Sequence, residues 1–529
     1  MAKKSISPKI VQNEASAVPA FGLPVFFENV KINAWLFFIA GFLLYKSAIN
    51  HDFILDDSML IYKNHATKQG ISGIPEIFTT DVSLGNMDEN QHSGDVVVGG
   101  RYRPLSIAVF AVIYSFFGQK PAPFHFATIL FYALCCMVFY RSLVVILKNE
   151  RFGNLIAWLA TALFTLHPIH TEVVNNNKAT DEIFSLAFCL IGLVFTLESY
   201  RNGRNRGLIW AFLCFLTAAF SKENAVMFVA VVPLALWIFG KSDLRQQPPK
   251  LAELAKFSWP ILAATAIFLT VRGAVLGWSV GEDKLNLINN AFVKFEGGKW
   301  VHFSFFEKYA TILYTLGKYF WLHIFPHPLS ADYYPKAIAM QDFSSPAVIA
   351  SLILYVWMLF YSVRAIFRGQ NTPFVFGILF YLITLFIVSN IPVSLGTNMA
   401  ERFAFMPSAG LCLSFASGIV WILSKKPGWS NGIFAFVGVF FAFFILKTLS
   451  RTEDYVNNKT LFAADALVVP QSARVHYGLG GQFVRDAMAK DLPPGQKQSA
   501  LLQAIAEFDK GIAIHPTYSE CFYARGSAH

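Results

Sequence analysis

Long apolar runs, separated by short polar loops, constrain this chain more than any other feature of its sequence. Several runs reach the ~18–20 residues that a helix needs to cross a bilayer, and 55% of the 529 residues are hydrophobic. Only 14% are charged, well below the ~25% typical of soluble domains. The sequence therefore predicts an all-α, polytopic membrane protein with about eleven transmembrane helices. The predicted spans are residues 33–50, 124–147, 154–168, 182–199, 207–220, 225–240, 256–276, 346–363, 373–389, 403–424 and 431–449.

Two further apolar runs favour helices that lie in the membrane interface. Residues 104–117 are too short to span comfortably and lie in a long polar loop, 51–123. A second long loop, 277–345, contains the run 309–325. Amphipathic or short apolar helices of this kind rest at the lipid–water boundary.

The distribution of Lys and Arg predicts the orientation. The loops after the second, fourth, sixth, eighth and tenth spans carry the basic residues, and such loops face the cytoplasm. Residues 1–32 are then cytoplasmic, and the first span reads as an uncleaved signal-anchor. The formal charge of +10 follows from this topology, so we expect no nucleic-acid partner. The loops 51–123 and 277–345 face the outer side.

The sequence around Asp56 and Asp57 is the strongest candidate for chemistry. These adjacent carboxylates, together with Asp52, directly follow the first apolar run. At a water–lipid boundary, desolvation can raise a carboxyl pKa toward that of a working base. The alternative is a helix stop, because Asp commonly caps helices and acids lie outside membranes.

The other polar clusters that could take part in chemistry nearly all fall on the same predicted face. Helix caps scattered at random would not favour one side so strongly. They contain Arg101, Arg103, His167, His170, Glu172, Lys222, Glu223, His327, Asp332, Glu401 and Arg402. Each also has a structural interpretation: histidines bonded to nearby backbone, a kink at Lys222, a surface ion pair at Glu401–Arg402, and an interfacial anchor at His327 and Asp332. A metal site is not predicted, because His-Pro-x-His lacks a nearby third ligand.

Residues 451–529 have the composition of a soluble helical unit. Ala504, Phe508, Gly511 and Pro516 have the spacing of the second helix of a tetratricopeptide repeat (TPR), and His476–Gly480 is similar to a first helix. Such repeats need neighbours to bury their faces, so we expect the natural protein to continue beyond residue 529. The alternative is a lone helical hairpin packed on the membrane domain.

Outward carboxylates, interfacial helices and a peptide-binding unit together favour glycosyl transfer from a lipid-linked sugar phosphate. The phosphate needs Arg or Lys, and the acceptor hydroxyl needs a general base such as a carboxylate. His, Asp, Glu and Asn suit the sugar hydroxyls.

The chain resembles the GT-C glycosyltransferases, and most closely the transmembrane and TPR O-mannosyltransferases in a bacterial-type version. The matching stretches, in family order, are Phe53 to Asn64, Arg101 to Leu105, Phe124-His125, Leu166 to Glu172, Ser221 to Glu223, Phe325 to Tyr333, and Met399 to Arg402 with Pro407-Ser408. Residues 33–450 would form the GT-C-like catalytic domain. The chain departs from the family's pattern at residues 81–100 and at Asn175 to Lys178. The identities of the sugar and of the acceptor are therefore left open.

The resemblance implies a polyprenyl- or dolichyl-phosphate-mannose donor, a Ser/Thr acceptor in a protein bound by the TPR-like unit, and an inverting single displacement. It implies Asp56 as base and Asp57 as its support. Arg402 or Lys222 would hold the donor phosphate. Further donor-binding candidates are Arg101, Arg103, Glu401, His167, His170, Glu172, His327 and Asp332. No cofactor is assigned, and a divalent metal is left undetermined.

Three other readings compete with this one. A transferase of the same fold could glycosylate a lipid or a glycan instead of a protein. A transporter would place its ionisable groups near mid-membrane, whereas here they lie at helix ends. A scaffold that anchors the repeats needs one span, not eleven. We expect a bacterial inner membrane with the active face toward the periplasm, or the endoplasmic reticulum of a eukaryote.

Overall fold

The computed structural model describes residues 25–81, 101–242, 247–278, 285, 287, 290–370, 372–489 and 492–529. Most of the predicted cytoplasmic segment 1–32, and all but the first residue of the segment 81–100, therefore lie outside the described residues. Part of the predicted outer loop 277–345 does so as well.

The described part is almost entirely helical, in agreement with the predicted class. The main helices are α1 (Val30–Leu44), α2 (His65–Lys68), α3 (Ile74–Thr79), α4 (Pro104–Phe117), α5 (Pro121–Ile146), α6 (Gly153–Leu166), α7 (Thr171–Asn175), α8 (Thr180–Asn202), α9 (Arg206–Ser221), α10 (Phe228–Phe239), α11 (Leu251–Leu276), α12 (Phe305–Ile324), α13 (Pro346–Phe367), α14 (Pro373–Phe386), α15 (Phe405–Lys425), α16 (Ser430–Asp454), α17 (Asn458–Val468), α18 (Ala473–Ala487), α19 (Pro494–Ile514) and α20 (Ser519–Ala528). One antiparallel hairpin, β1 (Val293–Glu296) with β2 (Lys299–His302), precedes α12.

Short turns of helix join several of these elements. Those near the candidate site are η3 (Ser58–Tyr62), η5 (Pro168–His170), η6 (Asn177–Ala179), η7 (Glu223–Met227) and η8 (Glu401–Ala404).

Each predicted span overlaps a helix, and the two predicted interfacial helices are α4 and α12. Among the described residues, six helical segments are long and apolar enough to cross a membrane, namely those containing α5, α8, α11, α13, α15 and α16. The helices of the other predicted spans are shorter and also apolar. These helices are those expected of a membrane protein, while the number eleven stays a prediction.

Local sequence explains several of the helix boundaries. Pro121, Pro346 and Pro373 open α5, α13 and α14, where the missing N–H of proline costs nothing. Gly203 ends α8 with φ +64°, a left-handed conformation that glycine adopts without strain. The proline and glycine positions therefore account for these helix ends.

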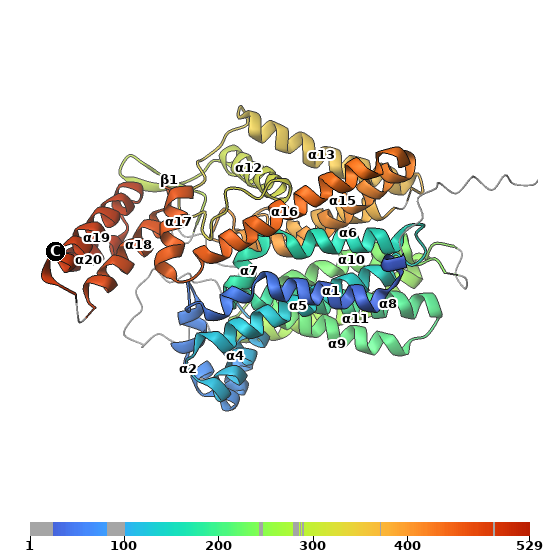
Figure 1. Cartoon of the computed structure of the whole chain (residues 1–529), viewed down its shortest axis with the longest axis horizontal. Helices are drawn as coiled ribbons and strands as arrows, with labels where there is room; N and C mark the ends of the chain where they lie inside the picture. Colours follow the sequence, from blue (N-terminus) through green and yellow to red (C-terminus); the bar gives the residue numbers. More distant parts are fainter. Residues whose placement is uncertain are drawn as a thin grey trace, which may run out of the picture.

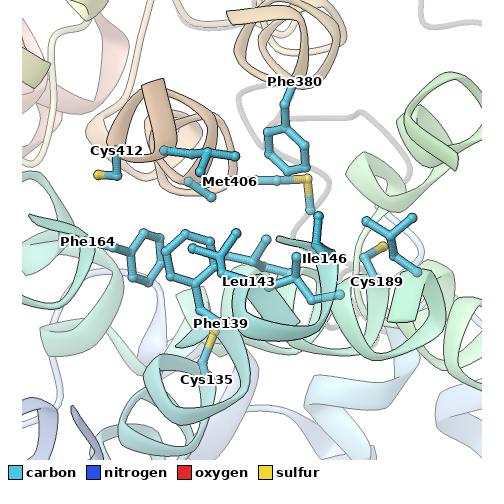
Figure 2. Close-up of a cluster of buried hydrophobic side chains, with 14 of the residues drawn as sticks. Cys135, Phe139, Leu143, Ile146, Phe164, Cys189, Phe380, Met406 and Cys412 are labelled. Carbon is cyan, nitrogen blue, oxygen red and sulfur yellow. The ribbon is translucent and has the colours of Figure 1, made fainter. Parts of the chain in front are cut away.

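The core is an apolar contact surface shared by α5, α6, α8, α14 and α15 (Figure 2). Phe139, Leu143 and Ile146 form one face of α5 because they recur at helical spacing. Phe164, Cys189, Phe380, Met406 and Cys412 come from the neighbouring helices, and all are buried. All six cysteines are free.

Helix α15 is the central helix of this core, and α16 lies at its edge. In the most apolar part of the segment containing α15, 83% of residues are buried, against 17% for the segment containing α16. A Cβ on Gly410 would lie 2.5 Å from the carbonyl oxygen of Gly377 in α14, so only glycine permits this helix contact. The exposed apolar faces of α11, α13 and α16 suit contact with lipid.

The basic loops gather at one end of the helices. Arg201, at the end of α8, donates to the carbonyls of Val145 (2.6 Å) and Phe239 (3.0 Å), where α5 and α10 end. Asn149 donates to the carbonyl of Lys241 (2.7 Å). The loops after the second, fourth and sixth predicted spans therefore share an end, as the charge pattern predicts. Which side of a membrane this end faces stays a prediction.

The C-terminal helices α17 to α20 form a separate layer at the opposite end of the molecule (Figure 1, red). Phe508 and Ala504 are fully buried in a small core between α18, α19 and α20. Of the residues chosen from repeat spacing, Ala504, Phe508 and Gly511 are buried and Pro516 is exposed, and the assignment to TPR repeats stays a prediction.

Candidate active site

The loop that carries Asp56 is held in place by the segment that follows α16. The backbone N–H of Asp52 donates to the carbonyl of Val456 (2.9 Å), and that of Leu55 donates to Asn458 Oδ1 (2.8 Å). Leu55 adopts φ +48°, a left-handed conformation that costs a non-glycine residue free energy unless its surroundings enforce it. The two clamping bonds supply that enforcement and fix the position of Asp56.

Asp56 forms an ion pair with Lys178, which follows α7. The Asp56 side chain is 38% exposed and that of Lys178 is 14% exposed, so the pair lies at a surface that solutes can reach. The positive charge of Lys178 holds the pKa of Asp56 well below its usual range. Asp56 is therefore an ionised carboxylate at neutral pH with a cation beside it.

Asp57 is buried, and its carboxylate joins two segments of the chain. Its oxygens accept hydrogen bonds from Ile54 N (3.3 Å), Asn177 Nδ2 (3.0 Å) and Lys178 N (3.1 Å). Burial raises the pKa of Asp57 to about 7, although the three N–H donors favour its ionised form. Because it binds the backbone of Lys178, Asp57 sets the geometry of the Asp56–Lys178 pair.

A second group of ion pairs lies around α8, and its Lys222–Glu182 pair is the buried one. Arg103 binds Glu223 through Nε (2.9 Å to Oε2) and Asp181 through NH1 (2.7 Å). Lys222 pairs with Glu182, and both side chains are almost entirely buried. Lys222 and Arg103, both predicted to contact the donor phosphate, are thus neutralised by carboxylates of the chain. Their role toward a donor stays a prediction.

Arg402 is anchored by Glu172. Its backbone N–H donates to Glu172 Oε2 (2.8 Å), and its guanidinium binds Oε1 of the same carboxylate. Glu172 is fully buried, whereas the Arg402 side chain is 22% exposed. The buried carboxylate therefore orients Arg402 and leaves part of its guanidinium accessible to a ligand.

Glu401 fixes the loop after α12. Its Oε1 accepts from Ser330 N (2.6 Å) and from the hydroxyl of Tyr333 (2.7 Å). These bonds place Asp332, between the two donors in sequence, at the rim of the site. Glu401 is buried and acts on this loop, which suits a positioning role.

The histidines of the predicted cluster lie in a buried network. His170 contacts the Tyr132 hydroxyl (3.1 Å) and Ser408 Oγ (2.9 Å). His167 accepts from Ile169 N (3.2 Å) and contacts the carbonyl of His323 (3.0 Å). All four ring nitrogens have partners, which favours the structural interpretation. His327, in contrast, is exposed on the loop after α12.

We call the group of charged side chains around Asp56, most of them partly exposed, the outer basin. It contains Asp56, Lys178, Arg101, Arg402, Asp332, Arg474 and the carboxylate of Glu172 behind Arg402. The charges of Arg101 and Arg402 both act on Lys178, and that of Arg474 acts on Asp56 and Asp332. Arg101 forms no ion pair with any residue that the structure describes. Four cations thus face three carboxylates, and the excess of positive charge suits an anion.

Sequence reasoning missed Lys178, Asn177 and Arg474. Asn176-Asn177-Lys178 is a polar run directly before the apolar helix α8, and that position could have indicated it. Arg474, on α18, carries no such local pattern. Within the described ranges, no three His, Cys, Asp or Glu side chains are grouped as a metal site would require.

Known proteins provide an independent comparison. No protein-family model matches the chain. A protein O-mannosyl-transferase of Caenorhabditis elegans is 24% identical over 463 residues, which cover 84% of this chain and 59% of that protein. Protein O-mannosyl-transferase TMTC1 of Homo sapiens is 24% identical over 529 residues, 92% of this chain and 56% of the relative. Protein O-mannosyl-transferase TMTC4 of Mus musculus is 22% identical over 489 residues, which cover 84% of this chain and 63% of that protein.

The chain is similar to protein O-mannosyl-transferases. This similarity supports the glycosyltransferase relationship that the sequence motifs indicate. The chain spans roughly 56% to 63% of the length of these relatives, and its resemblance to the GT-C class and to a bacterial type stays a prediction.

Proposed function

We propose that this chain is a membrane glycosyltransferase that moves a sugar, with mannose the first candidate, from a polyprenyl or dolichyl phosphate to Ser/Thr hydroxyls of proteins. The observation that carries the proposal is Asp56, an accessible and ionised carboxylate in a basin with excess positive charge. A general base and an anion site side by side meet the two main needs of this reaction.

The proposed step is a single inverting displacement. Asp56 takes the proton of the acceptor hydroxyl while that oxygen attacks the anomeric carbon of the sugar. The bond from that carbon to the phosphate oxygen breaks, and its electrons leave with the polyprenyl phosphate. The leaving group gains negative charge in this step, and Lys178, Arg402 and Arg101 are the accessible cations that stabilise it.

Lys178 also gives donor binding a means to activate the base. In the free protein its charge keeps the pKa of Asp56 low, which makes Asp56 a weak base. A donor phosphate that binds Lys178 neutralises much of this charge and raises the pKa of Asp56. Asp56 then becomes an effective base when the donor is in place.

An apolar hollow offers a place for the lipid chain of the donor. It has a volume of about 320 Å³ and is open to the surroundings, and it lies between α3, α4 and α5. Its lining is Ile74, four residues of α4, Ala127 and Phe131. Helix α4 begins directly after Arg103. The hollow therefore lies on the helix that follows Arg101 and Arg103.

The test is transfer of radiolabelled mannose from polyprenyl-phosphate-mannose to a Ser/Thr-rich peptide pool by the purified chain in lipid nanodiscs. Asp56→Asn should reduce transfer by about 10²–10⁴-fold, the usual contribution of a general base, with donor binding retained. Asp52→Asn is the matched control, because Asp52 is an exposed carboxylate of the same loop, and it should retain activity.

Unchanged transfer in Asp56→Asn would remove Asp56 as the base. If the wild-type chain binds the donor without modifying peptides, a lipid or glycan acceptor becomes the better reading. If no donor binds, the transferase assignment fails, and the transporter and scaffold readings return. The membrane in which to test the native chain is a bacterial inner membrane, or the endoplasmic reticulum for a eukaryotic host.

A further inference from the structure

One cation of the outer basin does not belong to the membrane helices. Arg474 is the second residue of α18, in the C-terminal unit, yet its NH1 lies 3.3 Å from Asp332 Oδ2 on the loop after α12. Its charge also acts on Asp56. The C-terminal unit therefore contributes a side chain to the surface beside the proposed base.

Several contacts hold Arg474 at this place. The hydroxyl of Ser472 donates to the carbonyl of Tyr334 (2.7 Å), and Lys336 Nζ donates to the carbonyl of Ile514 (2.6 Å). Trp300 of the hairpin donates to Thr517 Oγ1 (2.8 Å). The first two bonds join the loop that carries Asp332 to the start of α18 and the end of α19, and the third joins the hairpin to the segment after α19, so Asp332 and Arg474 face each other across a fixed junction.

The chemistry of this pair differs from that of the other basin cations. Arg474 is 43% exposed and Asp332 20% exposed, and they present N–H donors and carboxylate acceptors side by side. A peptide backbone offers the complementary groups, a carbonyl and an N–H. A phosphate offers acceptors only and is repelled by the carboxylate of Asp332. We therefore expect it to bind Lys178 and Arg101 instead.

We propose that Asp332 and Arg474 hold the backbone of the acceptor polypeptide, and thereby bring its hydroxyl to Asp56. Arg474 is then a positioning residue of the transfer site, supplied by the C-terminal unit. Asp332 was predicted from the sequence to bind the donor, and we now propose that it binds the acceptor. The inference rests on the proposed function for its hydroxyl acceptor, while polypeptide binding at this pair can be tested without transfer.

The experiment compares Arg474→Ala, Arg474→Lys and wild type in the chain of residues 1–529, with polyprenyl-phosphate-mannose and a Ser/Thr-rich peptide pool. Arg474→Ala should raise the KM for peptide about tenfold, the effect of losing hydrogen bonds from one charged group. The KM for donor and direct donor binding should stay unchanged, and Arg474→Lys should recover part of the loss.

Two control variants separate this role from a structural one. Lys336→Met removes a contact between the loop and α19 without touching the pair, so a role limited to docking predicts the same KM change for both variants. Arg525→Ala removes an arginine of the same unit whose partner is Asp509 (2.7 Å), and it should have no effect. Equal changes in Arg474→Ala and Lys336→Met would overturn the proposal, as would loss of donor binding with an unchanged KM for peptide.

A fluorescein-labelled sample of the same peptides gives the second readout, by anisotropy. If the wild-type chain transfers no sugar, the proposed function fails on its own account. Weaker peptide binding in Arg474→Ala, with binding retained in Arg525→Ala, would still support the acceptor role. The acceptor role would be refuted if the wild type and all of these variants bound the peptide equally well, or if none of them bound it.

Discussion

Two lysine–carboxylate pairs on neighbouring segments have the same chemistry and opposite surroundings. Lys222 and Glu182 are 1% and 0% exposed, whereas Lys178 and Asp56 are 14% and 38% exposed. A buried pair exchanges a partner for a ligand only at high cost, because the remaining charge would be buried without its nearest counter-charge. An accessible pair can open to bind a phosphate or to accept a proton. We therefore predict that the first pair supports the stability of the fold and that the second pair can react.

The largest expected effect is on stability at the buried pair. Lys222→Met should lower the free energy of unfolding by about 3–5 kcal/mol, because Glu182 loses its counter-charge in the core. Lys178→Met, the matched change at the accessible pair, should cost about 1 kcal/mol or less. Thermal unfolding of both variants in nanodiscs measures the difference.

The double variant Lys222→Met/Glu182→Leu sharpens this result. Removing both charges should restore much of the stability, since an apolar pair of similar volume needs no counter-ion. Similar unfolding temperatures for Lys222→Met and Lys178→Met would contradict the predicted difference in stability between the two pairs.

The next effect is on activity at the accessible pair. Lys178→Met should reduce kcat/KM for the donor by roughly 10–100-fold, the loss of one charged contact to phosphate. Lys178→Arg, which keeps the charge, should retain more activity. A radiometric transfer assay at saturating peptide measures this, and an unchanged kcat/KM in Lys178→Met would remove Lys178 from the donor site.

A smaller effect concerns pH. The pKa of Asp56 is lowered mainly by Lys178, so the wild-type base stays ionised down to about pH 4, and its loss of activity should begin only below that. The stability that this pair contributes is likewise present above about pH 4 and lost as the pH falls.

In Lys178→Met, burial raises the pKa of Asp56 with less opposition. The acid limb of log kcat/KM should therefore appear at higher pH than in the wild type. Profiles between pH 4 and 8 test this shift, and coincident acid limbs would show that Lys178 does not control Asp56.

The smallest effect is expected at Arg101, which is exposed and forms no ion pair among the described residues. Arg101→Gln should weaken donor binding by about 3–10-fold, as suits a solvent-screened cation. Titration with the radiolabelled donor measures it. A loss as large as that of Lys178→Met would show that Arg101 contacts the phosphate as directly as Lys178 does.

The sequence predicts elements better than it predicts partners. Apolar length and flanking charge locate the helices, since these depend on neighbouring residues, and the Asp56–Asp57 motif follows from its position beside a span. The pairings depend on contacts between distant segments: Asp56 and Lys178 are 122 residues apart, and Leu55 and Asn458 are 403 apart. Whether Lys222 meets a ligand or Glu182 is likewise decided by helix packing, which no local pattern encodes.

The clamp on Leu55 has a consequence for how the protein is made. Asp56 is synthesised early, directly after the first predicted span, but Val456 and Asn458, which hold its loop, emerge from the ribosome some 400 residues later. Until then, nothing enforces the left-handed turn at Leu55, and the base has no fixed position. We therefore predict that the proposed transfer begins only after the segment that follows α16 has been synthesised and has docked on this loop.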